Sequence, residues 1–112
     1  MHRTGRTILG VAALLAAAAL AEVAQSDEPT PARRDELIYR LRQDCGSCHG
    51  LTMKGGLGPP LLPAALASKP EDYLVDVVLK GIPDTAMPPW AFEIERREAL
   101  WLIRQLREGL RP

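Results

Sequence analysis

The chain has few side chains that can bind a metal ion. Its 112 residues include two cysteines and two histidines, which are Cys45, Cys48, His2 and His49. A structural zinc site takes four Cys or His ligands, so the cysteine pair would need two more. Only His49 and the N-terminal His2 are available, which argues against a zinc site.

Basic charge is not in excess either. The 14 Lys and Arg residues are balanced by 14 Asp and Glu residues. Proteins that bind nucleic acid rely on a surplus of Lys and Arg to neutralise phosphates. The composition therefore argues against a nucleic-acid partner.

The sequence also lacks an apolar run long enough to cross a bilayer. Residues 8–20 are rich in Ala and Leu, but they fall short of the roughly 20 residues that a spanning helix needs. They follow Arg3 and Arg6 and end in the A-x-A sequence at residues 19–21, which is typical of a cleaved secretory signal. We expect a signal peptide at residues 1–21, export to the periplasm, and no stable membrane insertion after cleavage. An uncleaved membrane anchor is the alternative.

The cluster that carries chemistry is the sequence CGSCH at residues 45–49. Two cysteines separated by two residues and followed at once by histidine are the attachment signature of a c-type haem. The thiols of Cys45 and Cys48 can add across the two vinyl groups, and His49 is placed to bind the iron through a ring nitrogen. In bacteria this attachment takes place outside the cytoplasmic membrane, so the expected export agrees with it.

Two other interpretations of the cysteine pair stay open. A redox dithiol usually follows a strand in a βαβ pattern, and no such pattern precedes Cys45. A disulfide between Cys45 and Cys48 would enclose a very small loop and would stabilise little. The sequence therefore predicts one covalently bound haem c. The haem would also staple a mature chain whose core is small.

Helical patterns dominate the rest of the chain. Residues 22–30 are polar and predict a flexible N-terminus. Thr30 and Pro31 then predict a helix start, as N-cap and first helical residue. The first helix is expected over residues 31–44, with Cys45 continuing its apolar stripe. That stripe recurs at helical spacing and consists of Leu37, Ile38 and Leu41.

The middle of the chain predicts two more helices. Residues 63–67 are expected to form a short helical turn. Ser68 and Glu71 make a capping-box pattern at the start of a helix over residues 69–80, and Gly81 is expected to end it. The apolar face of this helix is expected to consist of Tyr73, Leu74, Val77 and Val78.

The last helix is expected from about residue 93, with Gly109 near its end. Its apolar positions follow the 3.6-residue period and are Ile94, Ala99, Leu102, Ile103 and Leu106. Its other face is charged or polar and is expected to be solvated; it consists of Glu95, Arg96, Glu98, Arg104, Gln105 and Arg107. Leu41 and Leu106 are plausible partners where the first and last helices meet. Trp90 is expected either to pack near a haem propionate or simply to close the core.

A glycine- and proline-rich loop follows the CGSCH motif, at residues 50–60. Within it, the carbonyl of Pro59 can accept a hydrogen bond from the outer ring nitrogen of His49. Such a bond fixes the orientation of the ring and tunes the iron. Read alone, the same residues are an ordinary loop. Leu61 and Leu62 would line the haem edge.

A second loop, at residues 82–90, offers a ligand for the other face of the iron. No histidine other than His49 would remain in the mature chain, so bis-histidine ligation is excluded. Met53 lies only four residues after His49, whereas Met87 is well separated and flanked by prolines. We expect Met87 to be the distal ligand, although an isolated methionine is usually core filler. The remaining candidates are Lys54, Lys69 and Lys80.

In order and spacing, CGSCH, the GPPL stretch and the Met87 loop resemble the small class I c-type cytochromes. The resemblance covers roughly residues 34–109. It implies an all-α cytochrome c domain at residues 31–112, with three to four helices wrapped around one haem and the first and last helices crossing. It also implies roles for five residues: thioether attachment at Cys45 and Cys48, proximal ligation by His49 backed by Pro59, and distal ligation by Met87.

A narrower resemblance concerns the runs LRQDCGSCHGLTMKGGLGPPL and GIPDTAMPPW. They are similar to the NirC-type, or c55x-type, monohaem cytochromes associated with cytochrome cd nitrite reductase in denitrifying bacteria. This implies a one-electron carrier, not an enzyme, that delivers electrons to the reductase and receives them from an upstream donor. An accessory role in making the d-type haem of the reductase is the alternative. A catalytic or gas-binding haem protein would need an open sixth site, and Asp84 and Thr85 are expected to be turn residues.

Overall fold

The computed structural model describes residues 27–110. The predicted signal peptide and residues 22–26 of the predicted N-terminal segment lie outside this range. Within it, every regular element is helical, as predicted. The elements are α1 (Pro31–Arg40), the π-helix η1 (Leu41–Cys45), α2 (Gly46–His49), α3 (Pro63–Leu66), α4 (Glu71–Lys80) and α5 (Arg96–Glu108). None of these helices is both long and apolar enough to cross a membrane.

The first helix begins as predicted but ends later. The Thr30 hydroxyl accepts a hydrogen bond from the Arg33 N–H at 3.4 Å, and Pro31 is the first helical residue. The predicted end at residue 44 is wrong, because α1, η1 and α2 follow one another without a break up to His49. Gly46 does not end the helix, because its backbone is helical (φ −61°, ψ −26°) and its N–H bonds to the Gln43 and Leu41 carbonyls. Gly46 is also buried.

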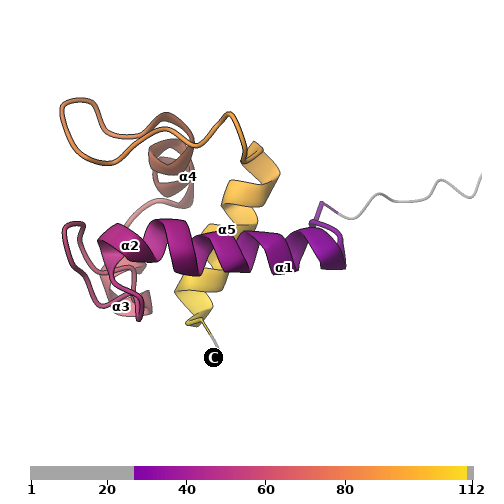
Figure 1. The fold of residues 1–112 in the computed structure, drawn as a ribbon, viewed down its shortest axis with the longest axis horizontal. Coiled ribbons are helices and arrows are strands. Elements are labelled where there is room, and N and C mark those ends of the chain that lie inside the picture. The colour runs from indigo at the N-terminus through magenta and orange to yellow at the C-terminus, as the bar shows by residue number, and fades with distance from the viewer. Residues whose placement is uncertain (1–26, 111–112) are drawn as a thin grey trace, which may run out of the picture.

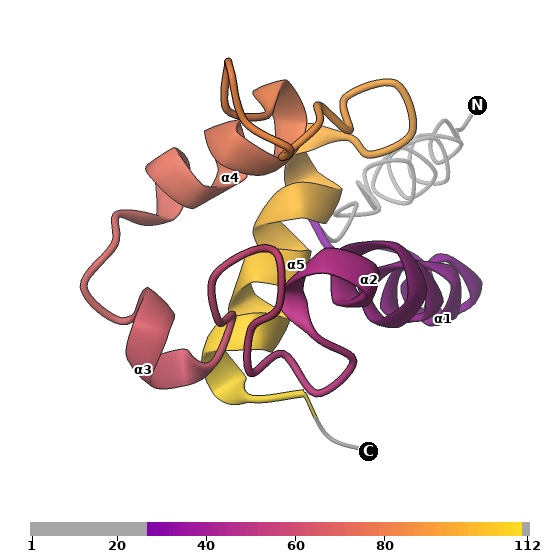
Figure 2. The same cartoon turned by 60° about the vertical axis from the view of Figure 1, so that its left-hand side comes forward.

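Helix α1 crosses α5, as Figure 1 shows. The last helix begins at Arg96, not at about residue 93 as predicted, because Glu95 is its N-cap. All five residues of the predicted apolar stripe are buried, but Ile94 lies just before the helix and only the other four belong to α5. They share one core with Leu37 and Leu41 of the first helix. Ala99 and Leu37 are completely inaccessible to solvent. Helix α5 runs through the middle of the fold, and it also contacts α3 and α4 (Figure 2).

The predicted start and face of α4 need correction. Ser68 makes no cap, because Pro70 is extended (ψ 139°) and is itself the residue before the helix, which begins at Glu71. Tyr73 is 53% exposed, so it does not belong to the buried face. Val75 takes that place and is 1% exposed. Gly81 ends the helix as predicted, with a φ of 68°.

Glu98 was expected on the solvated face of α5 and is instead buried, with 5% exposure. Its carboxylate accepts hydrogen bonds from Arg33 of α1 at 2.7 and 3.0 Å. It also accepts the Glu95 N–H at 2.9 Å, which completes a capping box at the start of α5. The Arg33 guanidinium holds the pKa of Glu98 below its usual range. This pair therefore clamps the two crossing helices together.

Candidate haem-binding site

The first three residues of the predicted site lie on one continuous helical segment. Cys45 ends η1, and Cys48 and His49 end α2. Residues three apart on a helix share a face, so the two thiols lie on the same side of this helical segment. Cys45 is partly buried against the core. A π turn precedes it, in which the Gly46 N–H bonds to the Leu41 carbonyl, and such turns are frequent at functional sites.

The chemistry of the cysteines does not suit a redox dithiol. They form no disulfide with each other. Burial, with a smaller contribution from the negative charge of Asp44, raises the pKa of the Cys45 thiol to about 11. Redox-active cysteines have the opposite property, a lowered pKa that keeps the thiolate present at neutral pH. Two half-buried thiols on one helix face suit covalent attachment of a prosthetic group better.

His49 is oriented by the loop that follows it. Its Nδ1 lies 2.7 Å from the carbonyl oxygen of Pro59. Because a carbonyl can only accept a hydrogen bond, Nδ1 must carry the proton and donate it. The other ring nitrogen, Nε2, then keeps its lone pair and is the atom that can bind a metal.

Glycines allow this loop to approach the motif so closely. A Cβ on Gly58 would lie 2.8 Å from the His49 ring, and one on Gly56 would lie 2.8 Å from the Cys48 carbonyl oxygen. The Gly58 N–H also donates to that carbonyl at 2.9 Å, and the Gly55 N–H donates to the His49 carbonyl at 2.8 Å. From the sequence, these glycines indicated only a loop. The number of glycines close to the CGSCH motif was the one sequence feature that could have predicted this close contact.

Met87 lies in a different segment, the loop that leads from α4 to α5, and it is half-buried. Figure 1 shows this loop and the loop after α2 on the same side of α5. Backbone hydrogen bonds from Trp90 and Ala91 to Val78 and Leu79 tie the loop to the end of α4. Trp90 packs against the core, which is one of its two expected roles, and stacks on Phe92, with ring centroids 6.0 Å apart.

Met53 is placed differently. It is 4% exposed and belongs to the main core cluster. Its φ of 59° lies in the left-handed region, where the chain turns after α2. Met53 is therefore a core residue of this fold.

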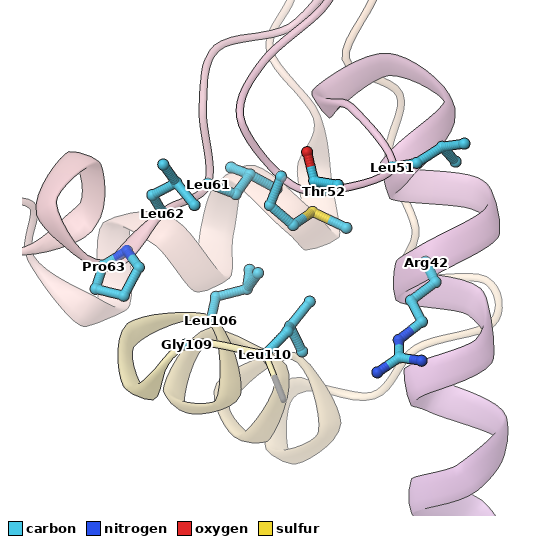
Figure 3. A pocket seen from close by; sticks show the side chains of 10 residues that line it. Arg42, Leu51, Thr52, Leu61, Leu62, Pro63, Leu106, Gly109 and Leu110 are labelled. Carbon is cyan, nitrogen blue, oxygen red and sulfur yellow. The ribbon is translucent and has the colours of Figure 1, made fainter. Parts of the chain in front are cut away.

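A shallow apolar hollow lies beside the site (Figure 3). Its walls come from the loop after α2, the start of α3 and the C-terminal end of α5. Arg42 is its one charged lining residue. None of the five predicted site residues lines it. The lining residues are Arg42, Leu51, Thr52, Met53, Leu61, Leu62, Pro63, Leu106, Gly109 and Leu110.

These residues fit a covalent haem. Two thiols on one helix face match the two vinyl groups, and the histidine that follows presents an unprotonated Nε2. Comparisons with known proteins agree. The family described as "Cytochrome C oxidase, cbb3-type, subunit III" matches residues 31–104. A cytochrome c55X of Pseudomonas aeruginosa is 53% identical over 85 residues, which cover 75% of this chain and 71% of the relative.

This chain belongs to the NirC-type, or c55X, group of c-type cytochromes. A solved structure of a c-type cytochrome NirC is 51% identical, with a TM-score of 0.72, and the match covers 73% of this chain and 96% of that one. The fold is therefore that of cytochrome c, and the prosthetic group is a covalently bound haem c.

A more distant relative is an enzyme. A dihydro-heme d1 dehydrogenase of Pseudomonas aeruginosa is 32% identical over 99 residues, which cover 88% of this chain. The match spans only 18% of that enzyme. The similarity therefore concerns one small portion of the dehydrogenase and does not transfer its activity to this chain.

Proposed function

We propose that this cytochrome is a one-electron carrier whose iron is held by His49 on one face and by Met87 on the other. The observation that carries the proposal is the hydrogen bond between His49 Nδ1 and the Pro59 carbonyl, which leaves Nε2 as the metal-binding atom. Haem c supplies reversible exchange between Fe(II) and Fe(III). Cys45 and Cys48 hold the group covalently, and the Pro59 carbonyl fixes the ring plane and raises the basicity of the histidine.

Ligation of the iron by Met87 would limit this cytochrome to electron transfer. A thioether opposite a histidine favours the reduced state and raises the reduction potential. If His49 and Met87 both bind the iron, no site would be open to a substrate, so we do not expect the chain to act as an enzyme. The prolines at positions 88 and 89 stiffen the loop that presents Met87.

The proposed partners are other redox proteins. Leu57 and Pro60 are exposed next to the His49 loop, and the Leu57 side chain is 78% exposed. They form an apolar rim that suits a small, transient interface. We propose export to the periplasm with removal of residues 1–21, which leaves the N-terminal segment at residues 22–30 and the cytochrome domain at residues 31–112. The proposed acceptor is cytochrome cd nitrite reductase of denitrification.

A second candidate function is an accessory role in making the d-type haem of that reductase. The similarity to part of a dihydro-heme d1 dehydrogenase favours it. This role would use the same haem c and the same five residues. It differs in the partner, which would be an enzyme of tetrapyrrole maturation.

The variant Met87→Ala tests the proposed ligation. We expect the ferric wild-type protein to show the thioether-to-iron charge-transfer band and the ferrous protein to bind carbon monoxide poorly. Met87→Ala should lose the band and bind carbon monoxide readily. If wild type and variant have the same spectrum and the same carbon monoxide affinity, the closed-site proposal is wrong. A gas-binding or catalytic protein would then be favoured.

A further inference from the structure

The loop that carries Met87 is closed by hydrogen bonds to its own first residue. The Ile82 N–H donates to the Met87 carbonyl at 3.1 Å. The Ile82 carbonyl accepts the Thr85 N–H at 3.2 Å and the Thr85 hydroxyl at 2.7 Å. Residues 82–87 thus form a compact turn in which both ends are bonded.

The Thr85 side chain occupies the centre of this turn. Its Oγ1 donates to the Ile82 carbonyl, and the same oxygen accepts the Met87 N–H at 3.3 Å. Both backbone polar groups of Met87 are therefore bonded inside the turn, the carbonyl to Ile82 and the N–H to Thr85. The Thr85 hydroxyl therefore links Met87 to Ile82, with one hydrogen bond to each.

The backbone around this turn has little conformational freedom. Asp84 has a φ of 61°, a conformation that a non-glycine residue adopts only when its surroundings hold it there. A Cβ on Gly81 would lie 2.6 Å from the Met87 carbonyl oxygen. The Met87 backbone therefore lies tightly between the end of α4 and the Thr85 hydroxyl.

We propose that Thr85 is the positioning residue for the distal ligand, and that its hydroxyl keeps the Met87 thioether on the iron and so keeps the sixth position closed. This inference rests on the proposed ligation by Met87. It concerns a different step, namely what keeps the thioether bound. Thr85 touches the Met87 backbone and acts on the iron only through it.

Three variants of the full-length haem protein test the inference. Thr85→Val keeps the shape of the side chain and removes the hydroxyl, Thr85→Ser keeps the hydroxyl, and Met87→Ala removes the ligand. A covalent haem stain and helical circular dichroism establish that each variant is folded and loaded. The readouts are the thioether-to-iron band of the ferric protein, carbon monoxide binding by the ferrous protein, and hydrogen exchange of the Met87 amide.

We expect Thr85→Val to weaken the band, to accelerate exchange of the Met87 amide, and to raise carbon monoxide affinity about fivefold for each hydrogen bond lost. Thr85→Ser should behave as wild type. If Thr85→Val matches wild type while Met87→Ala loses the band, the role of Thr85 is refuted and the ligation stands. Equal effects of Val and Ser would refute it too, because the hydroxyl would not be responsible. If Met87→Ala matches wild type, the ligation and the inference both fail.

Discussion

His49 makes one hydrogen bond that decides which of its nitrogens can bind iron. That bond depends on Gly58, whose missing side chain leaves room for the imidazole. A histidine that donates to a carbonyl is a stronger electron donor to its metal than one that donates to nothing. The proline carbonyl therefore has an electronic role as well as a positional one.

Gly58→Ala should raise the midpoint reduction potential. The added Cβ would lie 2.8 Å from the His49 ring, so the ring or the Pro59 carbonyl must move and the 2.7 Å bond must lengthen. A weaker donor stabilises the ferric state less, and losing one hydrogen bond corresponds to a rise of roughly tens of millivolts. Redox titration measures this. Leu57→Ala, at the neighbouring exposed position, is the control and should not change the potential.

Glu98→Gln should lower the free energy of unfolding by about 1–3 kcal/mol at pH 7, because the buried partner of Arg33 loses its charge. A carboxylate with a lowered pKa stabilises the fold above its unfolded-state pKa and loses this effect as pH falls through the folded value. The difference between wild type and variant should therefore shrink below about pH 4.3. Urea unfolding at several pH values measures it, and a difference that does not change with pH would contradict the clamp.

Asp72→Asn is the matched control for Glu98→Gln. Asp72 also pairs with an arginine, Arg96, at 3.1 Å, but its side chain is 92% exposed. Exposed ion pairs contribute little to stability, since solvent screens them. We expect almost no change in unfolding free energy for this variant at any of the same pH values.

Sequence patterns predicted some helix ends correctly and others incorrectly. Thr30 and Pro31 predicted the start of α1 correctly, because capping is decided by neighbouring residues. Ser68 and Glu71 had the spacing of a capping box but did not form one, since the extended Pro70 places the helix start at Glu71. The apolar stripe of α5 was predictable from its period alone.

The burial of Glu98 could not be predicted in the same way. Its partner Arg33 is 65 residues away in the sequence, so only the crossing of α1 and α5 brings the two together. Within the candidate site, the hydrogen bond between His49 and Pro59 was predicted, because a proline ten residues after the histidine of a haem-attachment motif can present its carbonyl to the ring. Thr85 is a turn residue as predicted, but its proposed role toward Met87 could not be predicted, since a threonine in a turn has no distinctive local pattern.

Gly81, at the junction of α4 and the Met87 loop, should not tolerate a side chain. Gly81→Ala would place a Cβ 2.6 Å from the Met87 carbonyl oxygen, at a φ of 68°. Strain at such a position costs about 1–3 kcal/mol, and the overlap should also displace Met87. We expect a lower unfolding free energy together with a weaker thioether-to-iron band in the ferric spectrum.

The variant Gly109→Ala separates the effect of backbone strain from the effect of displacing Met87. Gly109 also has a positive φ, of 83°, but its added Cβ would meet only Pro63, at 3.8 Å. The variant should lose stability from backbone strain alone and keep the spectral band. If Gly81→Ala also keeps the band, the turn does not hold Met87 as described.

The fold as a unit suits transient encounters with a partner. Helix α5 contacts α1, α3 and α4, so the helices form one body around it. Ion pairs also join α4 to α5, such as Arg96 with Asp76 and Arg104 with Glu71, but they are largely exposed and contribute little to stability. The site loops carry few charges, and the exposed Leu57 lies among them. Such a surface can form and break contacts quickly, as an electron carrier requires.

Electron transfer to cytochrome cd nitrite reductase is the most direct test of the proposed carrier. Stopped-flow absorbance would follow oxidation of the ferrous cytochrome by the purified reductase, with and without nitrite. We predict rapid, salt-sensitive oxidation that continues through many turnovers only when nitrite is present. If the cytochrome shows a normal histidine–methionine spectrum but transfers no electrons, the role as donor to this reductase is contradicted, and the role in haem maturation is favoured instead.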